Sequence, residues 1–134
     1  MPKEDYLLKY LEKLSRVIAA MFGFRDKGFP EDALQLADEC FKELFGINQE
    51  ELDVMPFEHF VELIKKGGYS AIFLEILAKL LYETAKSKEI SDNSIEFHQK
   101  ALEVYILLNE KDKTFSFERE MIISELKELI EKSK

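Results

Sequence analysis

Few residues in this chain have the type and spacing of a metal-binding or catalytic group. The chain has two histidines, and neither His59 nor His98 follows a glutamate at the three-residue spacing that di-iron helical bundles use. His59 does precede Glu62 by three positions on one helical face, so this pair is the one candidate for a pair of metal ligands. Two unpaired histidines and one cysteine are too few for a closed site. We therefore predict no metal ligands and interpret both histidines as packed or partly exposed side chains.

Nucleophilic catalysis is equally poorly supported. Cys40 would need a base and an oxyanion site, but its position on the apolar stripe of its helix predicts a buried packing role. Most carboxylates are spaced to pair with Lys or Arg on a solvated helix face, and Lys79 is placed to pair with Glu75. The glycine pair Gly67 and Gly68 lacks the spacing and the following Lys-Ser or Lys-Thr of a phosphate loop. We predict a non-enzymatic protein without catalytic or cofactor-binding residues and without a cofactor.

Composition indicates one helical domain over residues 1–134. Hydrophobic residues make up 46% of the chain and charged residues 34%, with only 5 Gly and 3 Pro, which is typical of a globular helical protein. The net charge of −8, with scattered basic residues, argues against nucleic acid as a partner. Acids from the fourth residue onward argue against a secretory signal, and no apolar run is long enough to span a membrane. A cytoplasmic location without membrane contact is the expectation.

Apolar spacing predicts helices throughout the first half of the chain. The first is expected from Lys3 to Phe22, followed by a turn at Gly28. The second begins at Pro30 and ends before Gly46. A capping box of Asn48 and Glu51 predicts a short helical turn ending near Asp53, and Pro56 opens a third helix that ends at the glycine pair 67–68.

The second half predicts three more helices, which brings the total to about six. The segment from Tyr69 to Lys86 is apolar almost all round, so we place that helix at the centre of the fold. Ser91 or Asp92 is the expected cap of the fifth helix, and either Thr114 or Ser116 caps the sixth. No segment alternates with a period of two, so no sheet is predicted.

Two segments carry the small-residue spacing of a tetratricopeptide repeat. SIEFHQKALEVY and EDALQLADECFKEL match the second helix of such a repeat at Ser94, His98 and Ala101 and at Ala33, Ala37 and Cys40. Gly28 and Phe24 also match the first unit, whereas Tyr82 and Glu89 depart from the pattern in the second. The first matching positions of the two segments, Ala33 and Ser94, are 61 positions apart, nearly two repeats of about 34 residues, so residues 47–68 must replace or distort a repeat.

The opening DYLLKYLEKLSRVIAAMFGFRDKG resembles that of an uncharacterised bacterial family of helical proteins, a domain of unknown function. These resemblances imply an all-α, tetratricopeptide-like array of antiparallel helix pairs with right-handed superhelical stacking. They supply no activity and no catalytic residues. The family implies only the fold.

Aromatic and basic residues give the only candidates for a partner-binding site. Phe22, Phe24 and Phe29 crowd one turn, and Phe115 and Phe117 flank the start of the last helix. The residues chosen as a possible site combine positive charge with one of these aromatic rings: Lys13, Arg16, Phe24 and Arg25. Surface salt bridges are the alternative role for the basic side chains.

The leading hypothesis from sequence is a protein-interaction module that holds a peptide or a partner helix in the concave side of a helical array. A self-associating structural protein that forms a homodimer is the first alternative. An enzyme that acts on a small molecule or depends on a metal is the second. The sequence names no particular partner.

Overall fold

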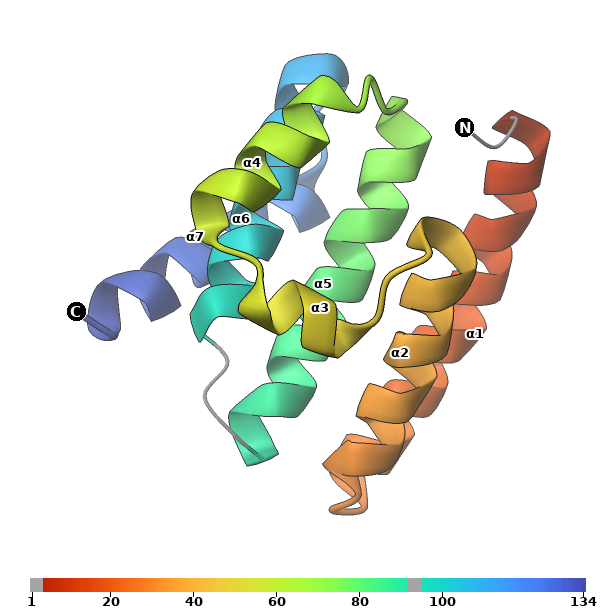
Figure 1. Ribbon diagram of the computed structural model, residues 1–134, viewed down its shortest axis with the longest axis vertical. Coiled ribbons are helices and arrows are strands. Elements are labelled where there is room, and N and C mark those ends of the chain that lie inside the picture. Colours follow the sequence, from red (N-terminus) through yellow and green to blue (C-terminus); the bar gives the residue numbers. More distant parts are fainter. Residues whose placement is uncertain (1–3, 92–94) are drawn as a thin grey trace.

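The computed structural model describes residues 4–91 and 95–134, apart from the side chains of residues 90 and 91. In these ranges the chain forms seven helices and no strand, as the sequence predicted for the fold class (Figure 1). The helices are α1 (Glu4–Asp26), α2 (Pro30–Phe45), α3 (Gln49–Val54), α4 (Phe57–Lys66), α5 (Ala71–Ser91), α6 (Ile95–Lys111) and α7 (Phe117–Lys132). The count exceeds the predicted six because the short turn capped by Asn48 is a helix, α3, in its own right.

Helix α5 lies at the centre, as its apolar pattern predicted. It packs against α1, α2 and α6, and most of its side chains are buried. The polar strip of α5 is half-buried. It consists of Glu75, Lys79, Glu83 and Lys86. A helix that is apolar nearly all round is stable only when several neighbours cover it, and three helices do so.

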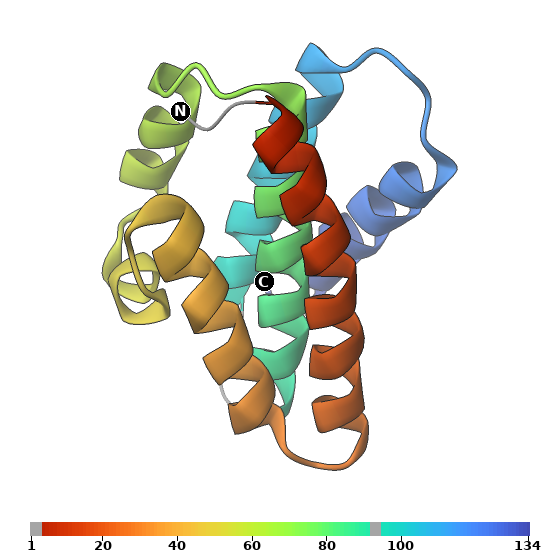
Figure 2. The same cartoon turned by 90° about the vertical axis from the view of Figure 1, so that its right-hand side faces the viewer.

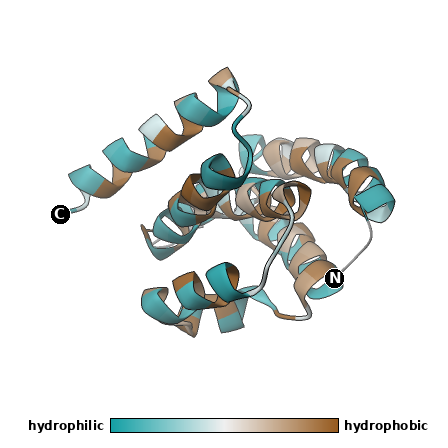
Figure 3. Cartoon of the chain, turned by 90° about the horizontal axis from the view of Figure 1, so that it is seen from above, coloured by the Kyte–Doolittle hydropathy of each residue, from teal (hydrophilic) through white to brown (hydrophobic). Residues whose placement is uncertain are grey.

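The other long helices surround this centre. Helices α1 and α2 lie side by side against one flank of α5, and α6 covers the other flank (Figure 2). Helix α7 packs on α6, so α1 and α7 lie on opposite sides of the central α5–α6 pair (Figure 3). Ala33 and Ala101 are fully buried in α2 and α6, where their small side chains let neighbouring helices approach closely.

The segment between α2 and α5 forms two shorter helices. The predicted capping box is present: the Asn48 side chain accepts from the Glu51 backbone N–H, and the Glu51 carboxylate accepts from the Asn48 N–H. Pro56 immediately precedes α4, which packs against α6. Helices α3 and α4 therefore connect α2 to α6.

Helix boundaries differ from the prediction at three places, the end of α1 and both ends of α5. Helix α1 continues through Gly23 to Asp26, since one glycine inside a helix costs only about 1 kcal/mol, and α5 continues to Ser91, since no glycine or proline follows Lys86 before that point. Ser91 therefore lies inside α5 and is not the cap of α6; the other predicted cap, Asp92, and the repeat residue Ser94 lie outside the described residues. Helix α5 begins at Ala71, after Tyr69, and Ser116, not Thr114, caps α7 by accepting from the Arg119 N–H.

No helix in the described part of the chain combines the length and apolar character that crossing a membrane requires.

Candidate apolar binding cleft

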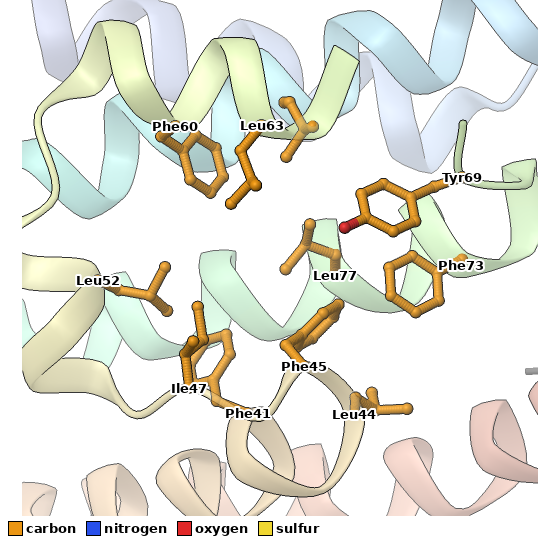
Figure 4. Close-up of a pocket in the computed structure, with 11 residues that line it drawn as sticks. Phe41, Leu44, Phe45, Ile47, Leu52, Phe60, Leu63, Tyr69, Phe73 and Leu77 are labelled. Carbon is orange, nitrogen blue, oxygen red and sulfur yellow. The ribbon is translucent and has the colours of Figure 1, made fainter. Parts of the chain in front are cut away.

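An apolar cleft lies between α2 and α4. Helix α2 packs on α5 and α4 packs on α6, and the space left between α2 and α4 encloses about 420 Å³ (Figure 4). Eleven side chains from α2, α3, α4, α5 and the adjoining loops line it: Phe41, Leu44, Phe45, Ile47, Leu52, Phe60, Leu63, Ile64, Tyr69, Phe73 and Leu77. This volume lies within the range of known ligand pockets, which is about 300–1,000 Å³.

A chain of aromatic contacts shapes one wall of the cleft. Phe41 and Phe45 lie one turn apart on α2 with ring centroids 6.2 Å apart. Phe45 meets Phe73 of α5 edge to face at 4.9 Å, and Tyr69 stacks on Phe73 at 4.5 Å. Such pairs stabilise beyond the area that they bury, so this wall is held in one arrangement before any ligand arrives.

The glycine pair before α5 places the Tyr69 ring in the cleft. Gly68 has φ of 61°, a conformation that side chains disfavour, and Gly67 is the C-cap of α4. A Cβ at Gly67 would overlap three atoms of the Tyr69 ring, so only glycine lets the ring lie against the end of α4. The Tyr69 backbone carbonyl accepts from Lys111 Nζ at 2.6 Å, which ties the same residue to the end of α6.

The opposite wall is the apolar face of α4. Phe60 and Ile64 are buried, whereas Leu63 remains 42% exposed. Leu63 also borders a shallower hollow with His59, Glu62 and Lys66, so it separates the apolar cleft from a charged surface. An exposed leucine at the edge of an apolar cleft marks its mouth.

The lining of the cleft is almost purely hydrocarbon. Ten of the eleven side chains carry no polar side-chain atom, and none is charged. The exception is Tyr69, whose hydroxyl oxygen points toward Leu77 across the cleft in Figure 4. Without an acid, a base or a nucleophile, these side chains can exclude water and bind apolar groups, and the hydroxyl can form one hydrogen bond.

Helix α3 is fixed at the far end of the cleft by polar contacts. The ammonium group of Lys100, only 1% exposed, donates to the Leu52 carbonyl and lies 5.9 Å from the Phe60 ring centroid. Burial lowers the pKa of Lys100, while the nearby carboxylates of Glu96 and Asp53 act in the opposite direction. Because Leu52 is also a lining residue, this buried lysine supports the end wall of the cleft.

Two further bonds tie α3 to its neighbours. Asp53 of α3 forms an ion pair of 3.1 Å with Lys88 of α5. At the start of the helix, the Gln49 backbone N–H donates to Asp38 of α2 at 2.8 Å. Both ends of α3 are therefore anchored.

The residues chosen from sequence as a partner site lie elsewhere and do not converge. Lys13 pairs with Glu43 of α2 at 3.0 Å, and Arg16 is exposed. Phe24 is partly buried against the core. Arg25 is 12 residues from Lys13, or about 18 Å along α1. The structure brings none of these four residues to the cleft.

Arg25 contacts side chains of α5. Its guanidinium forms an ion pair of 2.9 Å with Glu83 of α5, and the two side chains are 10% and 13% exposed. It also donates to the Ser87 hydroxyl at 3.2 Å. Breaking a pair at this depth leaves a charge uncompensated, so Arg25 serves to join α1 to α5.

The candidate chemical residues are dispersed. Cys40 is buried, and burial raises the pKa of its thiol. His98 is also buried, and its Nε2 lies 2.8 Å from a Glu89 carboxylate oxygen. His59 is exposed on α4. Among the described residues no three His, Cys, Asp or Glu side chains gather in a way that would hold a metal ion.

Sequence reasoning missed the cleft because its most telling residues lie outside the expected inward stripes. Leu63 lies beside the buried residue Ile64 of α4, and Tyr69 and Ile47 lie in or next to loops. One signal was available: the face of α4 from Phe57 to Ile64 is wider than contact with one neighbouring helix requires. A second apolar contact for α4 could have been inferred from it.

The chain matches no protein-family model, no curated protein and no solved structure.

Proposed function

We propose that this protein is a non-enzymatic interaction module that binds the apolar face of a partner helix or peptide in the cleft between α2 and α4. The observation that carries the proposal is a preformed hollow of about 420 Å³ lined by eleven side chains of which none is charged. Surfaces of this kind recognise helices through apolar side chains spaced one turn apart. The lining offers no group for proton transfer or nucleophilic attack, which supports binding as its role.

The energetics of burial favour a partner with several anchors. Burying one Leu or Phe side chain contributes about 1.5–3 kcal/mol, whereas association costs about 4–15 kcal/mol in lost freedom. One inserted side chain therefore cannot hold a partner. A helix that places a residue in the cleft at successive turns can reach a stable complex, because the anchors share a single association cost.

We further propose that α1, α2, α5, α6 and α7 follow the order of a tetratricopeptide-like array, as the resemblance of the opening to an uncharacterised bacterial family implies. The contacts of α1 with α2, of both with α5, and of α6 with α5 and α7 support that arrangement. In this interpretation α3 and α4 replace part of a repeat and build the cleft. The buried thiol of Cys40 suits a reducing compartment such as the cytoplasm.

A displayed library of amphipathic helices tests the proposed function. Sequences selected on the native chain should lose binding to Leu63→Glu, which places a charge at the mouth of the cleft, and should retain binding to Met121→Glu. Met121 is a matched control because it is also an exposed apolar residue, on α7. Selected helices that bind both variants equally well, or a library that yields no binder, would contradict the proposal.

Self-association is the second candidate because a separate group of apolar side chains is exposed around the start of α7. Phe115, Phe117 and Met121 are 75%, 69% and 58% exposed. If they form a homodimer contact, light scattering will give a mass that doubles with concentration, and Phe115→Ser with Phe117→Ser will restore the monomer mass. A constant monomer mass over the same range would exclude this alternative.

A further inference from the structure

The negative charge of the chain is concentrated on α2, α3 and α4, three of the four helices that line the cleft. Residues 30–66, which contain α2, α3 and α4, carry ten acidic and three basic side chains. Their net charge is −7, whereas the whole chain has −8. Eight of these ten acidic side chains are exposed. The remaining helices are therefore nearly neutral, and the α2–α4 side is the acidic side of the molecule.

One of these carboxylates lies beside the mouth of the cleft, and none lines the cleft itself. Glu62 shares the shallow hollow beside Leu63, whereas the Glu43 carboxylate of α2 contacts Lys13 and Tyr10 of α1. Glu58 is exposed on the same helix as Glu62. Glu43 and Glu62 have lysine partners, Lys13 and Lys66, but the side as a whole keeps its excess of acid. An apolar cleft on an acidic side can recognise a partner by its apolar side chains and by its positive charge.

From this juxtaposition we propose that the partner is a basic amphipathic helix, with apolar residues one turn apart and Lys or Arg on the flanks. The inference rests on the proposed function and adds the charge of the partner to it. Apolar anchors enter the hydrocarbon cleft while the flanking cations meet the carboxylates around it, which raises the rate of encounter and fixes orientation. The Tyr69 hydroxyl can donate one hydrogen bond to the bound segment.

The same charge argues against other occupants of an apolar cleft. A fatty acid would bring its own carboxylate to the acidic side, and no lysine or arginine lines the cleft to receive it. An acidic peptide would meet the same repulsion. Helix α1 does not supply the missing cation, since none of its basic residues lines the cleft and two of them, Lys13 and Arg25, are paired with carboxylates.

The proposal is tested with two synthetic helices of about 16 residues that share the same Leu and Phe anchors. One carries Lys on its flanks and the other carries Glu at the same positions. Each is titrated with the full chain by fluorescence anisotropy at low and high salt. The Lys helix should bind about tenfold or more tightly than the Glu helix, and this difference should shrink as salt screens the charges.

Variants that replace glutamate by glutamine test which carboxylates of the protein attract the Lys helix. Glu58→Gln with Glu62→Gln should reduce the affinity for the Lys helix by about threefold to tenfold at low salt. The control, Glu128→Gln with Glu131→Gln on α7, makes the same charge change at exposed positions, each of which pairs with a lysine as Glu62 does. It should leave the affinity unchanged. All four positions are exposed, so these variants keep the fold.

The outcomes separate this inference from the function on which it rests. Equal binding of the Lys and Glu helices, abolished by Leu63→Glu in both cases, would refute the basic partner and support the cleft as a helix site. Binding of neither helix, or binding that Leu63→Glu does not affect, would overturn both proposals. Tight binding of dodecanoate that displaces the Lys helix would identify a fatty acid site and refute the basic-helix partner.

Discussion

Replacement of Gly67 by alanine separates the geometry of the cleft from the stability of the fold. Gly67 has helical backbone angles, so an alanine is compatible with the backbone. In such a position Gly→Ala stabilises a protein by about 0.4–1 kcal/mol, because it restricts the unfolded chain. The added Cβ, however, overlaps the Tyr69 ring and must displace it from its stack on Phe73. Losing that stack costs about 0.5–1.5 kcal/mol.

The two effects nearly cancel in the native background, so the net change in unfolding free energy should be within about 1 kcal/mol. In a Tyr69→Ala background no ring is displaced, and Gly67→Ala should then stabilise the chain by about 0.4–1 kcal/mol. A double-mutant cycle measured by urea unfolding and circular dichroism gives the coupling, which we expect to be about 1 kcal/mol. Equal stabilisation in both backgrounds would refute the contact between Gly67 and Tyr69.

Three further predictions concern the core and the ends of the fold. Ala33→Leu and Ala101→Leu should each overpack a helix crossing and cost about 1–3 kcal/mol, so melting within a degree or so of the native chain would contradict the helix pairing. The lowered pKa of Lys100 means that the unfolded chain binds more protons there, so the contribution of Lys100 to stability should rise as pH increases toward 10.5. Lys100→Met should lack this rise in urea titrations, and an identical pH dependence in both proteins would show that the lysine is not desolvated. Ending the chain near Lys113 should uncover the α6 residues Leu102 and Tyr105 and cause aggregation or dimerisation, whereas a stable monomer by light scattering would show that α7 is no cap.

Local chemistry allowed much of the fold to be predicted from sequence. Asn48 and Glu51 form a capping box whose partners are three residues apart, so no tertiary information is needed to recognise it. Pro30 sets the start of α2 in the same way, through its own backbone restriction. The central position of α5 followed from an apolar pattern that leaves only a narrow polar strip. Each of these features depends on residues close together in the chain.

The cleft and the ion pair of Arg25 depend on pairings between distant residues. Arg25 was named as a possible partner-binding residue with a salt bridge as its alternative role, and it pairs with Glu83, which is 58 positions later in the chain. Leu44 and Leu63 follow helical spacing, yet whether such a residue meets a core neighbour or an open cleft depends on the separation of α2 and α4. That separation is set by how each helix packs on α5 or α6. No local pattern encodes it.

Methyl-resolved NMR of the full chain, titrated with the Lys-flanked helix, tests the central claim most directly. The methyl groups of Leu44, Leu63 and Leu77 should shift and show intermolecular contacts with the apolar anchors, because these residues line the cleft. Those of Leu11 and Ile122, on α1 and α7, should remain unchanged. Shifts at Leu11 and Ile122 with no change at Leu63 would contradict the account and place the partner away from the cleft.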